Sequence, residues 1–379
     1  MAAIWKICPL RHIVLLISLL LTGFHLYLRK NESLAEKVSE GFIRPALRLM
    51  ARYTAHLPFS LAEALIAAAV LGLLLYTAFC IYRMVKGAQW LVSLYKMLIT
   101  PLVLALLVYA LFSSLWGAYF YIDDFAERAG IESGPVSTEQ LAAVTEYFAV
   151  LANEYSAQVQ RDENGVCCTD RASVVDASAH IFDNAEKLFP QLEGEDVPVK
   201  GIVFSKIMSY LDFTGFFFPI TGEANVNTDF PPSQFAATVA HEISHQRGVA
   251  REQEANFVAV LACLESENSD YCYSAALLAY THLGNALHSA DYEEWARIYN
   301  TLNEAVRCDF AADRAYWQQF ETPVQEVSNS FYEGFLHSYD QHLGLKSYGA
   351  CVDLLVNYYY DEFFTPRPHP APSSAQSLR

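Results

Sequence analysis

The chain has 379 residues, a formal net charge of −17 and a hydrophobic fraction of 53%. So negative a charge argues against nucleic acid as a partner, because binding phosphates requires a basic surface. A nucleotide is not expected as a ligand either, since the sequence contains neither GxxxxGK[ST] nor GxGxxG. The hydrophobic excess lies mainly in the first third, which indicates a membrane protein.

Three apolar stretches in the first third approach or reach membrane-spanning length, at about 12–28, 61–82 and 97–116. A helix that rises about 1.5 Å per residue needs about 20 apolar residues to cross the hydrocarbon core. We therefore predict a membrane domain over residues 1–121, with three transmembrane helices and the lipid bilayer as a partner. The first stretch could instead be a cleaved signal peptide, but no small-x-small cleavage site precedes Arg29 and Lys30, which favours a retained anchor.

The loops between these stretches bear on orientation. Residues 34–57 have the pattern of an amphipathic helix that lies in the membrane interface. Basic residues before the first stretch and in the acid-free second loop would place everything after residue 122 outside the cytoplasm, by the positive-inside rule: Lys6, Arg11, Arg83, Lys86 and Lys96. The first loop carries basic residues as well, so the charge count is nearly even.

Cysteines favour the same orientation. Six of the eight lie in the polar part of the chain: Cys167, Cys168, Cys263, Cys272, Cys308 and Cys351. An even number in an acidic domain suits disulfides in an oxidising compartment, and buried free thiols are the alternative. We therefore expect a multi-pass cell-membrane protein with an extracytoplasmic domain.

The polar part, residues 122–365, is predicted to be mainly α-helical with a small β-sheet. Ser137 and Gln140 suit a capping box for a first long helix, and extended segments are expected at 197–205 and 221–228. The second segment is placed to act either as an edge strand that pairs with a substrate backbone or as an ordinary loop. Further helices are expected at about 250–265, 273–288, 292–306, 311–342 and 348–363, and residues 366–379 form a disordered tail.

The segment ATVAHEISHQRGVAREQEANF, residues 237–257, carries the chemistry. Pro231 and Pro232 suit a helix start and Gly248 suits its end. His241 and His245 are four residues apart, so on a helix both imidazoles project from one face and can bind one Zn²⁺. Glu242 lies about 100° around that helix, where it can act as a general base toward a metal-activated water without being a ligand.

A catalytic zinc site needs a third protein ligand, and two acids are candidates. Glu252 shares a helix face with Asn256, which could hydrogen-bond a ligand from the second shell. Glu254 lies about 200° away from Glu252 on the same helix. We favour Glu252, with Glu254 as the alternative. Tyr348 is a candidate donor to the oxyanion of the reaction.

Two stretches of the sequence resemble segments of known protein families. The sequence EQEAN, residues 252–256, follows HEISH and resembles the third-ligand segment Glu-x-x-Ala-Asp/Asn of gluzincin-type metallopeptidases, in which the first glutamate binds the metal. The wider stretch 216–257, together with GLKSYGACVDLL at 344–355, resembles an uncharacterised family of multi-pass bacterial membrane proteins with a zincin signature. The resemblance implies that residues 122–365 form a zincin-like domain. The six residues between His245 and Glu252 are fewer than gluzincins usually have and are closer to the metzincin spacing.

These observations predict a membrane-anchored zinc metallopeptidase that cleaves a peptide or protein substrate, with Glu242 as base. The alternative is a non-catalytic membrane sensor or scaffold in which the zincin site is structural or vestigial. A transporter is disfavoured, because the three apolar stretches carry no charge near their centres.

Overall fold

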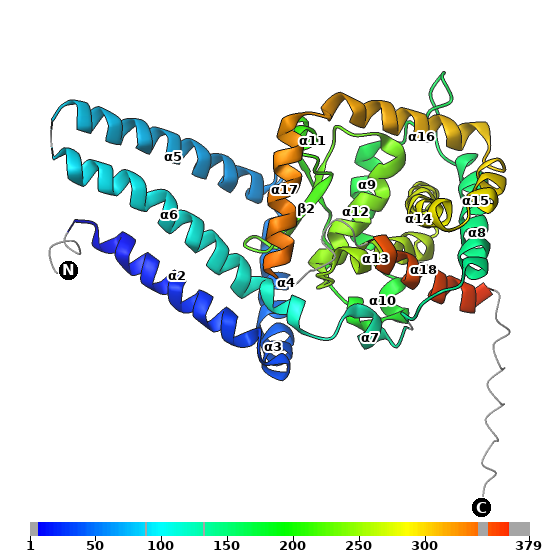
Figure 1. Cartoon of the computed structure of the whole chain (residues 1–379), viewed down its shortest axis with the longest axis horizontal. Coiled ribbons are helices and arrows are strands. Elements are labelled where there is room, and N and C mark those ends of the chain that lie inside the picture. Colours follow the sequence, from blue (N-terminus) through cyan, green and yellow to red (C-terminus); the bar gives the residue numbers. More distant parts are fainter. Residues whose placement is uncertain (1–6, 88, 132, 340–347, 364–379) are drawn as a thin grey trace, which may run out of the picture.

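The computed structural model describes residues 7–87, 89–131, 133–339 and 348–363, and shows three long helices that extend from one side of a helical domain (Figure 1). These are α2 (Pro9–Leu28), α5 (Leu61–Val85) and α6 (Trp90–Leu115), which contains Pro101. Each is long and apolar enough to cross a membrane, and little of its apolar surface is buried inside the protein. The prediction of three such helices is confirmed, with slightly wider bounds.

The segment expected to be one interfacial helix at 34–57 consists of three consecutive pieces, α3 (Glu32–Val38), a π-helical turn η1 (Ser39–Ile43) and α4 (Arg44–Ala55). One face of α4 packs on the polar domain, where a Cβ on Gly222 would come within 2.8 Å of backbone atoms of Leu47 and Ala51. Arg44 also donates to the carbonyl oxygens of Gln191 and Glu193. The apolar face of α4 therefore packs on the domain. An amphipathic helix that packs on a protein has the same sequence pattern as one that lies in the membrane interface.

The start of α5 is bonded to the sheet of the polar domain. The carboxylate of Glu223 accepts hydrogen bonds from the backbone N–H groups of Leu61 (3.1 Å) and Ala62 (2.8 Å). These are among the N–H groups that a helix leaves without partners at its first turn. In return, Glu63 accepts from the N–H groups of Val203 and Phe204, at 3.1 and 2.8 Å. Two carboxylates thus join a candidate membrane helix to the domain.

The sheet has three short strands, β1 (Lys200–Ile202), β2 (Gly215–Phe218) and β3 (Glu223–Asn227), in the order β1-β3-β2. β3 runs parallel to β1 and antiparallel to β2. The extended segment expected at 221–228 is present as β3. It is neither the edge strand nor the loop that were its two alternatives, because β3 is central and all five of its residues are buried. The free edge next to the HEISH helix belongs to β2, whose continuous Phe run lacks the alternation that marks a strand in sequence.

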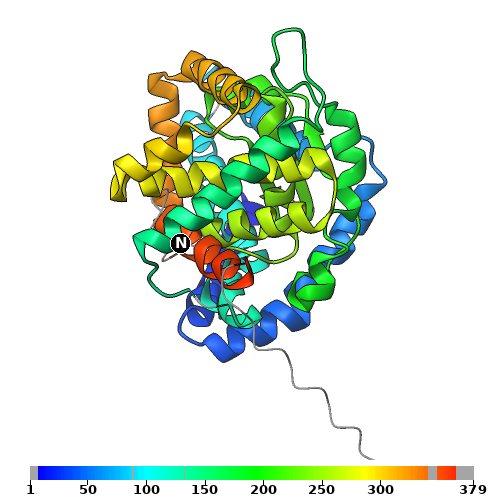
Figure 2. The ribbon, with the colours of Figure 1, turned by 90° about the vertical axis from the view of Figure 1, so that its right-hand side faces the viewer.

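Helices form the rest of the domain, and α8 and α18 lie in front when it is viewed from the side opposite the three long helices (Figure 2). Their bounds are α7 (Phe125–Ala129), α8 (Thr138–Ser156), α9 (Arg171–Ala177), α10 (Ala185–Leu188), α11 (Ser205–Tyr210), α12 (Pro232–Gln246), α13 (Glu252–Glu265), α14 (Ser269–Ala290), α15 (Tyr292–Tyr299), α16 (Glu304–Trp317), α17 (Pro323–Ser338) and α18 (Tyr348–Phe363). Single 3₁₀ turns lie at Gly117–Tyr121, Ser178–His180, Pro190–Leu192 and Gln318–Phe320.

Local sequence signals explain several of these bounds. The capping box of Ser137 and Gln140 is present at the start of α8. Two expected helices are each divided in the structure. The one at 292–306 breaks where Asn303 caps α16 through the N–H of Val306, and the one at 311–342 breaks before Pro323, which begins α17. The predicted tail, 366–379, lies outside the described residues.

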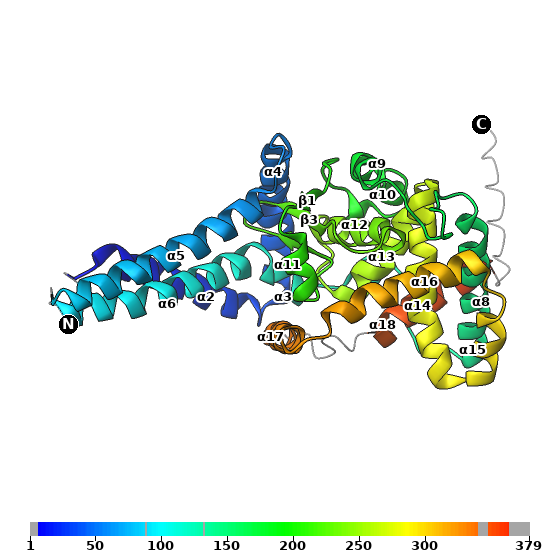
Figure 3. The same cartoon turned by 90° about the horizontal axis from the view of Figure 1, so that it is seen from above.

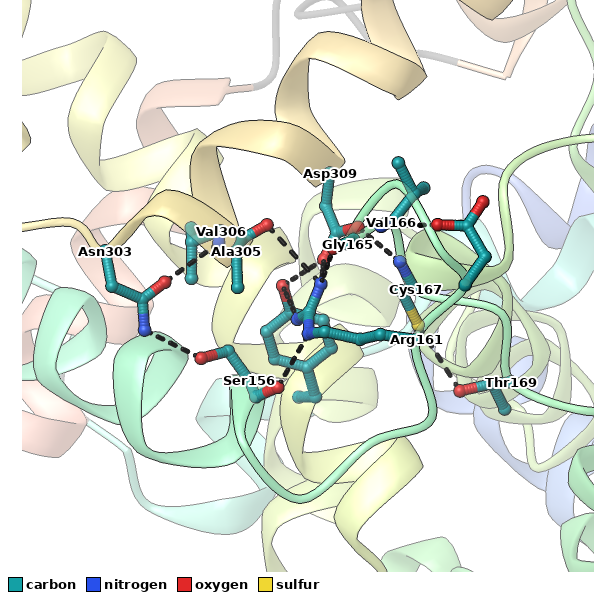
Figure 4. Close-up of polar contacts among 12 residues, drawn as sticks. Ser156, Arg161, Gly165, Val166, Cys167, Thr169, Asn303, Ala305, Val306 and Asp309 are labelled. Atoms are coloured by element: carbon teal, nitrogen blue, oxygen red, sulfur yellow. Dashed lines mark hydrogen bonds and ion pairs between the residues drawn. The ribbon is translucent and has the colours of Figure 1, made fainter.

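A buried ion pair fixes the loop between α8 and α9 to α16 (Figure 4). Asp309, whose side chain is fully buried, pairs with Arg161 at 3.0 Å and accepts from the N–H of Cys167 at 2.7 Å. It also accepts a hydrogen bond from the hydroxyl of Tyr273 on α14. Three segments distant in sequence therefore meet at one carboxylate.

The expected disulfides are not found. All eight cysteines lie in the described part of the chain, and all are free. Cys263 and Cys272 come from consecutive helices, yet the thiol of Cys272 donates to the carbonyl oxygen of Cys263 (3.3 Å) instead of pairing with its sulfur. The alternative of free thiols is the correct one, so cysteine content no longer supports an oxidising compartment.

Candidate metal centre

Helix α12 carries the two histidines on one face. His241 and His245 are separated by one turn, and their Nε2 atoms lie 3.1 Å apart. Small residues on the same helix, Ala236, Ala237 and Ala240, are buried. They let α12 lie close to its neighbours in the core, where the N–H of Ala237 donates to Ser274 of α14 at 2.8 Å.

A glycine turn directs the next helix back to these imidazoles. Gly248 has φ +94°, which favours glycine at the residue that follows a helix. Its N–H bonds the carbonyl oxygen of His245, and the N–H of Val249 bonds that of Ser244. Buried Arg247 fixes the turn through ion pairs with Glu186 (2.6 Å) and Asp196 (3.2 Å).

Of the two candidate acids, Glu252 is the one that reaches the histidines. Its Oε2 lies 3.2 Å from Nε2 of His241 and 3.6 Å from Nε2 of His245. Glu254 points away and accepts a hydrogen bond from the N–H of Ala126, 3.0 Å away. Burial raises the pKa of Glu254, whereas the two histidines overcome the effect of burial and hold the pKa of Glu252 well below its usual range.

The outer nitrogen of each imidazole has a fixed acceptor. Nδ1 of His241 lies 2.8 Å from the side-chain oxygen of Asn256, as expected from the helix spacing, and Nδ1 of His245 lies 2.7 Å from the carbonyl oxygen of Val249. Each ring therefore carries a proton on Nδ1 and directs Nε2 toward the other ring and Glu252. Two such nitrogens and a carboxylate this close together favour a cation among them. Burial lowers the pKa of His245, but the charge and hydrogen bond of Glu252 raise it to about 9.

The donor set fits a zinc ion. His241, His245 and Glu252 each offer one ligand atom, and these atoms lie within 4.8 Å of one another. Two imidazole nitrogens and one carboxylate oxygen are a common set for catalytic zinc. In the described residues one other group of histidines and acids comes as close, His180 with Asp183 and Asp196, but it lies at the surface.

Glu242 lies beside this group in an unusual environment. The residue is buried, and its Oε2 has no hydrogen-bond partner among the described residues. Burial raises its pKa to about 7, although the neighbouring histidines lower it. Gly215 at the start of β2 makes room for it, because a Cβ there would lie 2.4 Å from Oε1 and 2.6 Å from Cγ of Glu242.

Tyr332 of α17 is a site residue that the sequence did not indicate. Its hydroxyl donates to Oε1 of Glu252 at 2.7 Å, which leaves Oε2 facing the histidines. Nothing in the local pattern distinguishes Tyr332 among 23 tyrosines, and it lies eighty residues after Glu252. Tyr348, the predicted oxyanion donor, begins α18, but its side chain lies outside the described part of the structure.

Two cavities meet at the group. One of about 700 Å³ lies toward α14 and α16 and includes Thr281, Trp295 and Trp317 in its lining. The other, of about 560 Å³, lies between the domain end of α6, strand β2 and α17, and its lining is rich in aromatic side chains: Phe112, Trp116, Phe120, Phe213, Phe216, Phe217, Tyr332 and Phe335. His241 and Glu252 line both cavities. His241 and Glu252 are thus accessible from two sides, and His245 from the smaller cavity.

Comparison with known protein families gives a match over most of the chain. The model of the family described as "Protein of unknown function (DUF3810)" matches residues 39–356, a range that holds α5, α6 and the whole His241–Glu252 region. No curated protein and no solved structure matches the chain.

Proposed function

This chain belongs to the DUF3810 family, and we propose that it is a membrane-anchored zinc peptidase. The observation that carries the proposal is the convergence of His241, His245 and Glu252, with Glu242 beside them. His241, His245 and Glu252 would hold the ion. A zinc ion supplies Lewis acidity, which makes water a nucleophile near neutral pH and polarises a carbonyl group.

Glu242 is suited to move the proton of that reaction. A carboxylate with a pKa near the working pH accepts and releases a proton readily, and the pKa of Glu242 is raised to about 7. Its Oε2 makes no hydrogen bond in the described structure that would have to be broken first. Oε2 would take a proton from the attacking water and pass it to the leaving amine.

The other residues position these groups. Asn256 and Val249 fix the two imidazoles, and Tyr332 fixes the carboxylate of Glu252. The two cavities give room on both sides of the group for an extended polypeptide. The aromatic lining of the smaller cavity favours a substrate with a large apolar side chain at one side of the cleaved bond.

Metal analysis tests the first part of the proposal. We expect about one zinc per chain in purified wild-type protein and loss of that zinc in His245→Ala. The matched control is His180→Ala, which removes a histidine from the exposed group and should retain the zinc. Equal zinc in all three proteins would contradict the assignment.

Cleavage of a mixed peptide library, followed by mass spectrometry, tests the second part. Wild-type protein should produce new peptide ends, and Glu242→Gln should keep its zinc and produce none. Zinc binding without cleavage by the wild type would favour the non-catalytic sensor or scaffold.

We further propose that the domain lies outside the cytoplasm. The end of the helix bundle remote from the domain carries basic residues and no acids, including Arg11, Arg83 and Lys86, as the positive-inside rule expects of a cytoplasmic side. A reporter that is active only outside the cytoplasm, fused after Arg379, should be active. Activity of a cytoplasmic reporter at that position would reverse the orientation.

A further inference from the structure

Two segments of the domain expose rows of large apolar side chains. On α17, Val324, Val327 and Phe331 share one helix face by their spacing, with Val327 71% and Phe331 80% exposed. The segment 203–210, which includes α11, likewise exposes Val203, Phe204, Ile207 and Tyr210. Contiguous exposed apolar surface on a folded domain marks a contact with a partner or a membrane.

Other side chains of α17 contact the domain. Ser328 donates to the carbonyl oxygen of Leu211 and Asn329 to the carboxylate of Asp212, just after α11. Tyr332 reaches Glu252, and Leu336 is buried. The helix is therefore held in place from within, and its apolar row faces outward as a consequence of that fixed orientation.

Both segments are attached to the domain ends of membrane helices. The ring of Phe335 packs on Phe112 in the last turns of α6, with 5.1 Å between centroids. The hydroxyls of Tyr339 and Ser113 lie 2.7 Å apart, one residue further along α6. At the other helix, the N–H groups of Val203 and Phe204 bond Glu63 in the first turn of α5. The exposed rows thus begin where α5 and α6 leave the domain.

The views agree on the direction of α17. It runs across the ends of the long helices in Figure 1 and is seen end-on beside α6 in Figure 3, at the edge of the domain nearest the bundle. A bilayer crossed by α2, α5 and α6 would have its surface at this edge, and α17 would lie parallel to it.

We propose that α17 and the 203–210 segment lie in the interfacial region of the bilayer that the three long helices cross. Interfacial helices place one apolar face about 5–10 Å into the boundary between headgroups and acyl chains. Lys206, between the apolar residues of the second segment, suits this depth, since its ammonium group reaches Asp229 (3.1 Å) and lies 4.8 Å from the centroid of the Phe320 ring. The occupant is lipid because both segments are attached to the domain ends of α5 and α6, helices that are long and apolar enough to cross a membrane. This inference does not depend on the proposed peptidase activity.

Site-specific fluorescence in lipid nanodiscs tests the inference. Cys168 and Cys308, the cysteines that are not buried, are replaced by serine, and an environment-sensitive probe is attached to Val327→Cys or Phe331→Cys. The matched control is Val150→Cys, a valine that is 46% exposed and belongs to α8, a helix on the side of the domain remote from the bundle (Figure 2). Spin-labelled lipid with its label near the headgroup is then added to the nanodiscs.

We expect the label to quench the probe at 327 and 331 by about half or more, with blue-shifted emission, because an interfacial face lies within reach of such lipids. The probe at 150 should remain unquenched and polar in its emission. Equal behaviour at 150 and 327 would overturn the proposal. Blue-shifted but unquenched emission that depends on protein concentration would also overturn it, in favour of a second copy of the chain.

Discussion

The two histidines of the candidate metal centre are oriented by groups of different kinds. Val249 offers a backbone carbonyl, which a side-chain substitution leaves in place, whereas Asn256 offers the oxygen of its own side chain. Asn256 is therefore the point at which the orientation of an imidazole can be changed without touching a candidate ligand.

We expect Asn256→Ala to weaken zinc binding by about 10–100-fold, the usual cost of removing a partner of a metal-bound histidine. The measurement is a competition titration against a chelator of known affinity. Asn285→Ala is the control, because Asn285 lines the same 700 Å³ cavity from α14. An unchanged affinity in Asn256→Ala would show that the Nδ1 contact does not orient His241.

Gly215 gives a second prediction for single residues. A methyl group there would meet Oε1, Cγ and Cδ of Glu242, so Gly215→Ala should displace the carboxylate while leaving His241, His245 and Glu252 in place. We expect unchanged zinc content and a fall in kcat of about 10²-fold, within the range that a general base contributes. Loss of zinc together with activity would mean that the substitution disturbs the whole site.

The sequence predicted the residues of this site unevenly. His241, Glu242 and His245 lie within one helical turn, so a local pattern is sufficient to place them together. Tyr332 and Gly215 come from other elements, and only the tertiary fold brings them to Glu252 and Glu242. A local pattern contains no information about such contacts.

At the scale of elements, the sequence predicted the two helices that meet at Gly248. It did not predict how the second helix is oriented relative to the first. Pro232 begins α12 and Gly248 follows its end, as expected from the sequence. Which acid faces the histidines depends on the path of residues 247–251. That path is fixed by ion pairs of Arg247 to Glu186 and Asp196, more than fifty residues upstream. The sequence alone therefore left Glu252 and Glu254 open.

The buried pair of Arg161 and Asp309 is the element-scale contact most open to a stability test. Removing one partner of a buried ion pair leaves an uncompensated charge and costs about 3–5 kcal/mol. Asp309→Leu should lower the free energy of unfolding by about that amount, measured by denaturant titration of the protein in detergent. The double variant Asp309→Leu with Arg161→Met should recover much of the loss. A double variant no more stable than the single one would mean that hydrogen bonds to Cys167 and Tyr273 matter more than the charge.

For the whole molecule, the sequence predicted the division into three apolar helices and a helical domain, because long apolar runs and helical periodicity are strong signals. It did not predict that α4 and the start of α5 dock on the sheet, nor that β3 is central. Both depend on contacts between residues far apart in sequence. The disulfide expectation was wrong because compositional arguments cannot show where the helices place each thiol.

Zinc should stabilise the folded protein if it binds the folded state and not the unfolded chain. At a free concentration about 100 times Kd, binding contributes about 2.7 kcal/mol. With an unfolding entropy of about 2.1 cal/mol/K per residue, this corresponds to a rise in Tm of roughly 3–4 °C for a chain of 379 residues. We expect this rise when zinc is added to chelator-treated wild-type protein, and none for His245→Ala. An equal rise in both proteins would assign the effect to other sites.

The hydrogen bonds from α5 to Glu223 connect this helix, through the sheet, to Glu242. α5 has 25 residues and is about 37 Å long at 1.5 Å per residue, longer than a typical hydrocarbon core of about 30 Å. A helix of this length that crosses a bilayer can accommodate the excess by tilting, and that tilt changes with bilayer thickness. Its first turn is bonded to β3, β3 pairs with β2, and β2 begins at the glycine that abuts Glu242. We therefore expect kcat to vary with acyl-chain length in reconstituted bilayers. This dependence should weaken in Glu223→Ala, because that variant lacks the hydrogen bonds that connect α5 to the sheet and so to Glu242.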